Sequence, residues 1–374
     1  MKFLIVDHMY GAFVDWVYGS TPNLARSSYE HQRARIDAEL FGETQFEVAA
    51  LRALGHDASD HIANIKPLQR AWLHENGIRP SRARWTVRRR RHVVPWLKRV
   101  DDRWMGEALV ERVRHTKPDV VHIQSMDLLE PWVIAELRDE ARLVVGQVAT
   151  ELPSNRSYRD YGLVVSSIPG VVDRFRREGA DAEWLPLAFE PSVRESVAEV
   201  ERDIPVSFVG SFTSRYSDRI ELVEAVAKAA PLQTWTADIE SVPADSPIRP
   251  TIQGPAWGRS MYEVLARSQM TLNTHGRIAG DDANNLRLFE ATGMGALLVT
   301  DAKRNMGDLF DVGSEVVTYR DADDCARIVR YYVDHPDEAA AIAAAGQRRT
   351  ARDHTWANRM ARLAELVEPR LKAR

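Results

Sequence analysis

Residues 281–301, Asp-Asp-Ala-Asn-Asn-Leu-Arg-Leu-Phe-Glu-Ala-Thr-Gly-Met-Gly-Ala-Leu-Leu-Val-Thr-Asp, carry the pattern that decides the fold. The stretch opens with polar residues and then predicts a short helix, for which one of the asparagines at 284–285 is the expected N-cap. The Gly-Met-Gly turn at 293–295 predicts the end of this helix. The apolar run 296–299 then predicts a strand that is covered on both faces, as in a parallel sheet.

Four polar side chains gather at the loop and the first turns of this predicted helix: Asp282, Asn285, Arg287 and Glu290. A helix N-terminus attracts anions, and carboxylates and amides can bind sugar hydroxyls. The alternative is a capped amphipathic helix whose charges simply face water. The combination of two acids, an amide and a guanidinium favours a ligand site.

The run 285–301 resembles the donor-site segment of group 1 glycosyltransferases of the GT-B fold. More narrowly, it resembles the spore-maturation-type (CgeB-like) branch, in which Asn-x-Arg-x-Phe-Glu precedes a glycine pair. The wider family has a Glu, seven residues and a second Glu that binds the donor ribose. Glu290 matches the second acid, and Asp282 is a shorter replacement for the first. The resemblance covers 205–359 well and the preceding part only loosely.

Length and composition set broad limits on the protein. With 374 residues, 44% of them hydrophobic, the chain can form two domains. A net charge of −4 gives no sign of a nucleic-acid binder. The single cysteine, Cys325, excludes an intramolecular disulfide and a multi-cysteine metal site. The apolar start of the chain is too short for a signal peptide and no window predicts a transmembrane helix, so we expect a cytoplasmic protein.

Strands and helices alternate twice along the chain, which predicts α/β architecture with doubly wound parallel sheets. We expect two Rossmann-like domains facing a cleft, the GT-B arrangement that the resemblance implies. The expected boundaries are 1–198 for an acceptor-side domain and 199–352 for a nucleotide-sugar donor domain, with the linker in 189–203. Residues 353–374 should form a helix that crosses back to the first domain, again as the resemblance implies.

In the first domain, candidate site residues follow the predicted strands, because ligands bind at the carboxyl ends of parallel strands. After the first strand come His8, a candidate general base, and Tyr10 and Gly11, which are placed to contact the acceptor. Gln147 lies where relatives often have a histidine near the donor sugar. Glu151 follows the same strand and is a second candidate base.

Three strand exits of the second domain are expected to converge on the donor: residues 210–215, 274–277 and 281–290. Gly210 and Ser211 would offer backbone amides to a pyrophosphate. Arg215, His275, Asp282, Asn285 and Arg287 would contact the phosphates or the sugar, and Glu290 would hold the ribose.

The reaction class follows from these groups. Cations and helix N-termini can stabilise a departing diphosphate, and no spacing typical of metal ligands occurs, so metal-independent transfer without a further cofactor is expected. An inverting enzyme would need His8, His122 or Glu151 as base, although His122 can equally be packed within its strand. A retaining enzyme needs no base, and the acid-x7-Glu resemblance favours retention.

Two other functions stay open. A GT-B-type sugar-nucleotide epimerase would use the same donor groups without an acceptor, whereas a non-catalytic sugar-nucleotide-binding protein would have lost them. The presence of Arg287 and Glu290 argues against the latter. Neither a Walker A sequence nor a Gly-x-Ser-x-Gly motif occurs, which weighs against a P-loop kinase and a serine hydrolase.

Residues 79–99 contain nine Arg or Lys residues and no acid, with Trp and Val interleaved. Three interpretations compete: a solvated basic helix face, a patch for anionic lipid headgroups, or a contact for a phosphorylated acceptor. The first is the commonest fate of such a run. The sequence does not indicate the oligomeric state.

Overall fold

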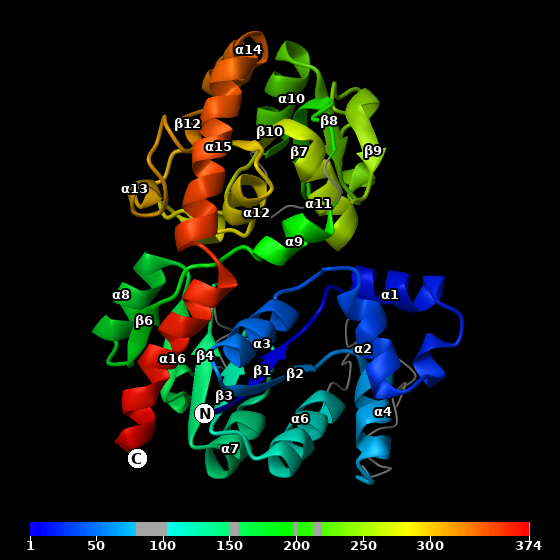
Figure 1. Cartoon of the computed structure of the whole chain (residues 1–374), viewed down its shortest axis with the longest axis vertical. Helices are drawn as coiled ribbons and strands as arrows, with labels where there is room; N and C mark the ends of the chain where they lie inside the picture. The colour runs from blue at the N-terminus through cyan, green and yellow to red at the C-terminus, as the bar shows by residue number, and fades with distance from the viewer. Residues whose placement is uncertain (80–102, 150–156, 198–199, 213–218, 374) are drawn as a thin grey trace, which may run out of the picture.

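The computed structural model describes most of the chain, namely residues 1–79, 103–149, 157–197, 200–212 and 219–373. It has two six-stranded sheets in which every strand pairs in parallel with its neighbours. Figure 1 shows the two sheets in separate domains, one above the other, each flanked by helices. The prediction of two Rossmann-like doubly wound domains is confirmed. The candidate Glu151, the candidate Arg215 and nearly all of the basic run 79–99 lie outside the described residues.

The first sheet has the order β2-β1-β3-β4-β5-β6. Its strands are β1 (Lys2–Asp7), β2 (Asp57–Ile62), β3 (Val120–Ile123), β4 (Leu143–Gln147), β5 (Leu163–Ser166) and β6 (Ala182–Trp184). The helices of this part are α1 (Gly11–Ser20), α2 (Tyr29–Asp37), α3 (Thr44–Ala53), α4 (Lys66–Glu75), α6 (Arg103–Thr116), α7 (Pro131–Glu140) and α8 (Pro169–Arg177). Strands β3, β4 and β5 are buried along their whole length, because helices cover both faces of a parallel sheet. The strand order reverses between β1 and β3, the switch point at which open α/β sheets bind ligands.

The second sheet has the order β12-β11-β10-β7-β8-β9, so its switch point lies between β7 and β10. Its strands are β7 (Ile204–Val209), β8 (Leu232–Trp235), β9 (Ile252–Gly254), β10 (Ser268–Leu272), β11 (Leu297–Asp301) and β12 (Val317–Tyr319). Its helices are α10 (Arg219–Ala229), α11 (Gly258–Arg267), α12 (Arg287–Gly293), α13 (Met306–Leu309), α14 (Ala322–Asp334) and α15 (Pro336–Asp353).

The chain passes between the domains twice, and the two passages are hydrogen-bonded to each other. The backbone N–H of Phe189, on the outward passage, donates to the carbonyl of His354 at 2.9 Å. The N–H of Trp356, on the return passage, donates to the carbonyl of Phe189 at 3.1 Å. The predicted linker 189–203 is not wholly irregular, because it contains the short helix α9 (Pro191–Ser196). Pro191 at the first helical position and the Glu190 carboxylate, which accepts the N–H of Ser192, explain that helix.

The last helix, α16 (Trp356–Lys372), lies against the first domain, as Figure 1 shows. Arg370 makes a bidentate ion pair with Asp181, and Arg142 donates to the carbonyl of Leu371 at 2.9 Å. Thr355 caps the helix by accepting the N–H of Asn358. The C-terminal helix therefore belongs physically to the first sheet.

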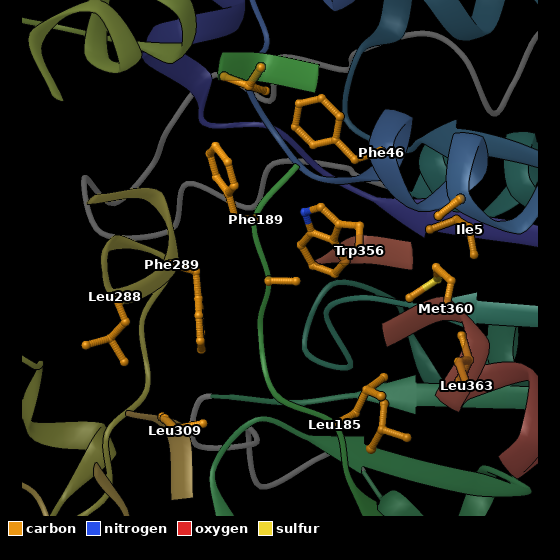
Figure 2. Close-up of a cluster of buried hydrophobic side chains, with 14 of the residues drawn as sticks. Ile5, Phe46, Leu185, Phe189, Leu288, Phe289, Leu309, Trp356, Met360 and Leu363 are labelled. Atoms are coloured by element: carbon orange, nitrogen blue, oxygen red, sulfur yellow. The ribbon is translucent and has the colours of Figure 1, made fainter. Parts of the chain in front are cut away.

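A single hydrophobic cluster runs through both domains at the crossing point. In Figure 2, Phe189 and Trp356 lie between Leu288 and Phe289 of the second domain and Ile5 and Phe46 of the first. Because these apolar side chains share one buried cluster, separating the domains would expose a large apolar surface to water.

Two buried polar side chains join the passages beneath this cluster. Nε2–H of His354 donates to the carbonyl of Leu309 at 2.7 Å, and Nδ1 accepts from Arg359 at 2.9 Å, so the imidazole is neutral. Burial lowers the pKa of His354 to about 4, with the Arg359 charge acting in the same sense. Arg359 also donates to the carbonyls of residues 186 and 187 on the outward passage.

The crossing point predicts a sensitive glycine. A methyl group on Gly293 would lie 2.3 Å from Cδ1 of Phe189. Since the paired passages hold Phe189 in place, Gly293→Ala should lower the free energy of unfolding by about 1–3 kcal/mol through overpacking. Urea denaturation measures this change. Gly307→Ala on α13, where a methyl group meets nothing within 4 Å, is the control. Equal urea midpoints for the two variants would show that Phe189 can move away and that the paired passages do not hold it in place.

Candidate functional site

The predicted donor residues Arg287 and Glu290 form an ion pair on the first turn of α12. Nη1 of Arg287 lies 2.8 Å from Oε2 of Glu290, which is only 8% exposed. The helix begins at Arg287 with Leu286 in the N-cap place, so the expected asparagine cap is out by one residue. Asn285 still supports the turn, because Oδ1 accepts the N–H of Leu288 at 3.3 Å. A buried carboxylate oriented in this way can accept hydrogen bonds from a diol.

Arg287 also joins α12 to the switch point of the second sheet. Nη2 donates to the carbonyl of Val209, the last residue of β7, at 3.2 Å. Gly210 and Ser211 come next in the chain. The N–H of Gly210 already donates to the carbonyl of Trp235, the last residue of β8, at 3.0 Å, so this predicted amide donor is committed to the sheet. On the other side of the pair, the hydroxyl of Tyr262 on α11 lies 3.4 Å from Oε1 of Glu290. Burial raises the pKa of Glu290, and the Arg287 charge opposes that rise.

Arg219 joins the exit loops of β7 and β10, which nothing in the sequence indicated. Its guanidinium donates to the carbonyl of Ser211 at 2.7 Å and to the carbonyl of Thr274 at 3.0 Å. The switch point lies between these two strands. This buried arginine therefore fixes the distance between the two loops that flank the switch point. Its position in the first turn of α10 was the available signal, but charged residues in first turns are common.

His275, the next residue along the β10 loop, is oriented by Asp301 at the end of β11. Nδ1 of His275 lies 2.6 Å from Oδ1 of Asp301, which also accepts the backbone N–H of His275 at 3.1 Å. Burial tends to raise the pKa of Asp301, but the His275 hydrogen bond and the Lys303 charge lower it overall. Asp301 is the last residue of the stretch 281–301, yet its pairing with a residue in the loop after another strand had no sequence signal.

Asp282, the other predicted donor acid, faces the first domain. Its carboxylate accepts from Arg304 at 2.6 and 3.1 Å and from the backbone N–H of Gly170, at the start of α8, at 2.9 Å. Both oxygens are therefore engaged within the described structure, and Asp282 is 3% exposed.

On the first domain, the predicted residues near the end of β1 occupy different environments. His8 lies 3.5 Å from the Asp7 carboxylate, which raises the pKa of His8 against the effect of burial. Tyr10 is 66% exposed, and Gly11 begins α1. Gln147 is the buried last residue of β4.

His122 is fully buried within β3, as the packing alternative predicted, and burial lowers its pKa to about 4. A fully buried imidazole within a strand is not accessible to an acceptor hydroxyl, so His122 is not a candidate base. Among the residues that the structure describes, no hydrogen bond or ion pair joins His8 or Gln147 to Glu290 across the domains.

The structure brings another acid, Glu43 at the N-cap of α3, within electrostatic reach of both switch points. Burial raises the pKa of Glu43 to about 8, and the charges of Asp7 at the end of β1 and Glu290 on α12 add to the rise. Glu47, one turn along α3, is buried and accepts a hydrogen bond from the amide of Gln124. Neither acid was expected from the sequence to belong to a site. The only signal for Glu43 is its place directly after the Phe-Gly break at 41–42, and acids are common at helix starts.

Glu43 predicts a pH-dependent change in stability. Its pKa is about 8 in the fold and near 4.5 ordinarily. The stability from its protonated form is therefore present below pH ~4.5 and lost as pH rises through 8. Glu43→Gln should have the same stability as wild type near pH 5 and be more stable by roughly 1–3 kcal/mol at pH 8.5.

Thermal or urea unfolding at both pH values measures the effect, and Glu30→Gln, at an exposed position of α2, is the matched control. A constant difference between Glu43→Gln and wild type across this range would show that Glu43 ionises without cost.

Comparisons with known proteins bear on this geometry. Residues 195–365 match a family model described as glycosyl transferase-like. The matched region contains β7, α12 and the Arg287–Glu290 pair. A search of curated proteins gave no match.

Solved structures match over nearly the whole chain. Anabaena HepE in complex with UDP-glucose is 12% identical, with a TM-score of 0.61 over 99% of this chain and 100% of HepE. Sucrose-phosphate synthase from Thermosynechococcus elongatus is 12% identical, with a TM-score of 0.59 and all of both chains covered. A glycosyltransferase from Rickettsia africae is 13% identical, with a TM-score of 0.59 and all of both chains covered. These likenesses show that the chain has the GT-B fold.

Two further searches cover only the described residues. They contain no group of three or more His, Cys, Asp or Glu side chains placed to hold a metal ion. Within the same residues, no helix is both long and apolar enough to span a membrane.

Proposed function

We propose that the protein is a glycosyltransferase that moves a sugar from a nucleotide-diphosphate sugar to an acceptor hydroxyl. The observation that carries the proposal is the buried Arg287–Glu290 pair, held at 2.8 Å beside the β7–β10 switch point. That point is where open α/β sheets bind nucleotides, and the region matches a glycosyl transferase-like model. The branch of the family stays a prediction.

In the proposed donor complex, Glu290 accepts the ribose hydroxyls while cations and amides face the diphosphate. The amide of Ser211 approaches the phosphates, Gly210 allows them close to the backbone because it has no side chain, and Arg287 lies beside them. His275, held by Asp301, is the neighbouring donor group on the β10 loop. Asn285 and Arg215 are proposed to complete this side. HepE was solved with UDP-glucose, so a uridine diphosphate sugar is the first donor to test.

We propose that transfer proceeds with retention and without a metal. The bond from the sugar C1 to the diphosphate breaks, the bond to the acceptor oxygen forms on the same face, and the acceptor proton leaves on the diphosphate. Arg287 and the Ser211 amide stabilise the charge that develops on the leaving diphosphate. In this role they replace a metal ion. Tyr10 and Gly11 are proposed to contact the acceptor, and His8, Gln147 and Glu151 are the candidates for assisting groups on that side.

A thermal-shift panel tests donor binding. UDP, GDP, dTDP, ADP and CDP are each added to wild type and to Glu290→Gln, which keeps the size of the side chain but removes its charge. A nucleotide at 100 times its dissociation constant should add about 2.7 kcal/mol to the stability of wild type. We expect one nucleotide to stabilise wild type and to have a much smaller effect on Glu290→Gln.

Glu263→Gln, at an exposed position of α11 one residue from Tyr262, is the control and should respond as wild type does. If no nucleotide stabilises the wild type, the transferase proposal loses its main support and a non-catalytic role gains it. Equal responses of the two variants would place the ribose away from Glu290.

Product analysis tests the reaction. With the nucleotide sugar identified by the panel and an acceptor library, NMR of the product should show the anomeric configuration of the donor, and EDTA should leave the rate within about twofold. Alanine variants at His8 and Gln147 should retain most of the turnover if no base is required. Loss of turnover in His8→Ala together with an inverted product would overturn retention. Net epimerisation of the donor without acceptor would instead identify an epimerase.

A further inference from the structure

Two helix N-termini at the domain interface are each capped by the opposite domain. On one side, the N–H of Gly170 in α8 of the first domain donates to Oδ2 of Asp282 in the second, at 2.9 Å. On the other side, the N–H of Arg259 in α11 of the second domain donates to the carbonyl of Glu39 in the first, at 2.6 Å. The first N–H groups of a helix have no acceptor within the helix, so each domain supplies a hydrogen-bond acceptor to a helix of the other.

Both contacts depend on a glycine that allows close approach. A methyl group on Gly170 would lie 3.0 Å from Oδ2 of Asp282 and 3.2 Å from Nη2 of Arg304. A methyl group on Gly258, which has φ of +45°, would lie 2.0 Å from the carbonyl oxygen of Glu39. Because these glycines have no side chain, an oxygen of one domain can approach the helix backbone of the other closely enough to accept a hydrogen bond.

The Asp282 carboxylate is fully used by this arrangement. Arg304 binds both oxygens, Gly170 binds one of them, and the side chain is 4% exposed. Burial alone would raise the pKa of Asp282, but the hydrogen bonds from Arg304 and Gly170 lower it overall. In the described structure Asp282 therefore acts as an ion that joins the domains.

We propose that Asp282 is an interdomain latch, a positioning residue that fixes α8 of the first domain against the second, and not a ligand for the donor sugar. Arg304 and a glycine N–H already engage the Asp282 carboxylate. The latch is independent of which reaction the protein catalyses, since its contacts are within the chain.

The amide of Gly170 is a direct reporter of the latch. Pro169 has no N–H, so Gly170 carries the first N–H of α8, which donates to Oδ2 of Asp282. Hydrogen exchange of this amide, followed without nucleotide, should be slow in wild type. In Asp282→Asn, which removes the charge and the Arg304 ion pair, exchange should be faster on the order of tenfold or more. The radius of gyration from small-angle scattering should rise in the same variant.

Gly170→Ala tests the same contact while leaving every charge in place, and it serves if Asp282→Asn does not fold. It should also raise the radius of gyration and speed the exchange of residue 170. The matched control is Asp203→Asn, which breaks a bidentate Arg267 pair at 2.6 and 2.8 Å between the start of β7 and the end of α11. That variant should change neither the exchange of Gly170 nor the radius of gyration.

A donor role gives the opposite pattern. Asp282→Asn would then bind UDP-glucose more weakly relative to UDP. Gly170→Ala would bind both nucleotides with the affinity of wild type. Hydrogen exchange of the amide at position 170 would be unchanged in both variants. That result would overturn the latch. Because exchange and scattering need no nucleotide, a negative nucleotide panel would refute the proposed function and leave the latch proposal standing.

Discussion

The pairing of the two chain passages at Phe189 and Thr355 is the constraint on which the two-domain arrangement depends. Backbone hydrogen bonds hold the passages side by side, and Phe189 fills the space above Gly293 that a side chain there would occupy. Trp356 continues the same apolar cluster into the first domain (Figure 2). Because cores are close-packed, a change at this point alters the relation between the domains as well as local packing.

Around that crossing, the interface combines apolar burial with a few directed polar contacts. The helix caps at Gly170 and Arg259 fix the facing edges, while the charges of the acids Glu43 and Glu290 interact nearer the switch points. Carboxylates that are close together in a partly buried place cannot all be charged without cost. The interface is thus firm at the crossing and the caps, and electrostatically costly where the substrates are proposed to meet.

The sequence determined the repeating units because their signals are local. Apolar runs, glycine turns and helix periodicity in 281–301 and in the paired halves predicted two doubly wound sheets, and the structure has them. The same run correctly placed Arg287 and Glu290 on one helical turn, since three residues bring side chains onto one face. The helix start differed by one residue because the start of this segment is engaged in tertiary contacts. The Asp282 side chain binds Gly170, the Asn285 side chain binds Asn273, and the backbone N–H of Ala283 donates to Asn305.

Only the tertiary structure decided which distant groups meet. Asp282 looked like a donor-site acid along the chain, yet its carboxylate reaches Gly170, which is 112 positions away. Asp301 orients His275, and the charge of Glu290 acts on Glu43, although nothing in the spacing of these residues connects them. Periodicity reports which face of a helix or strand is buried, but not what covers it. The sequence by itself therefore determined the elements and their order, whereas the packing of one domain on the other decided the partners of the charged groups.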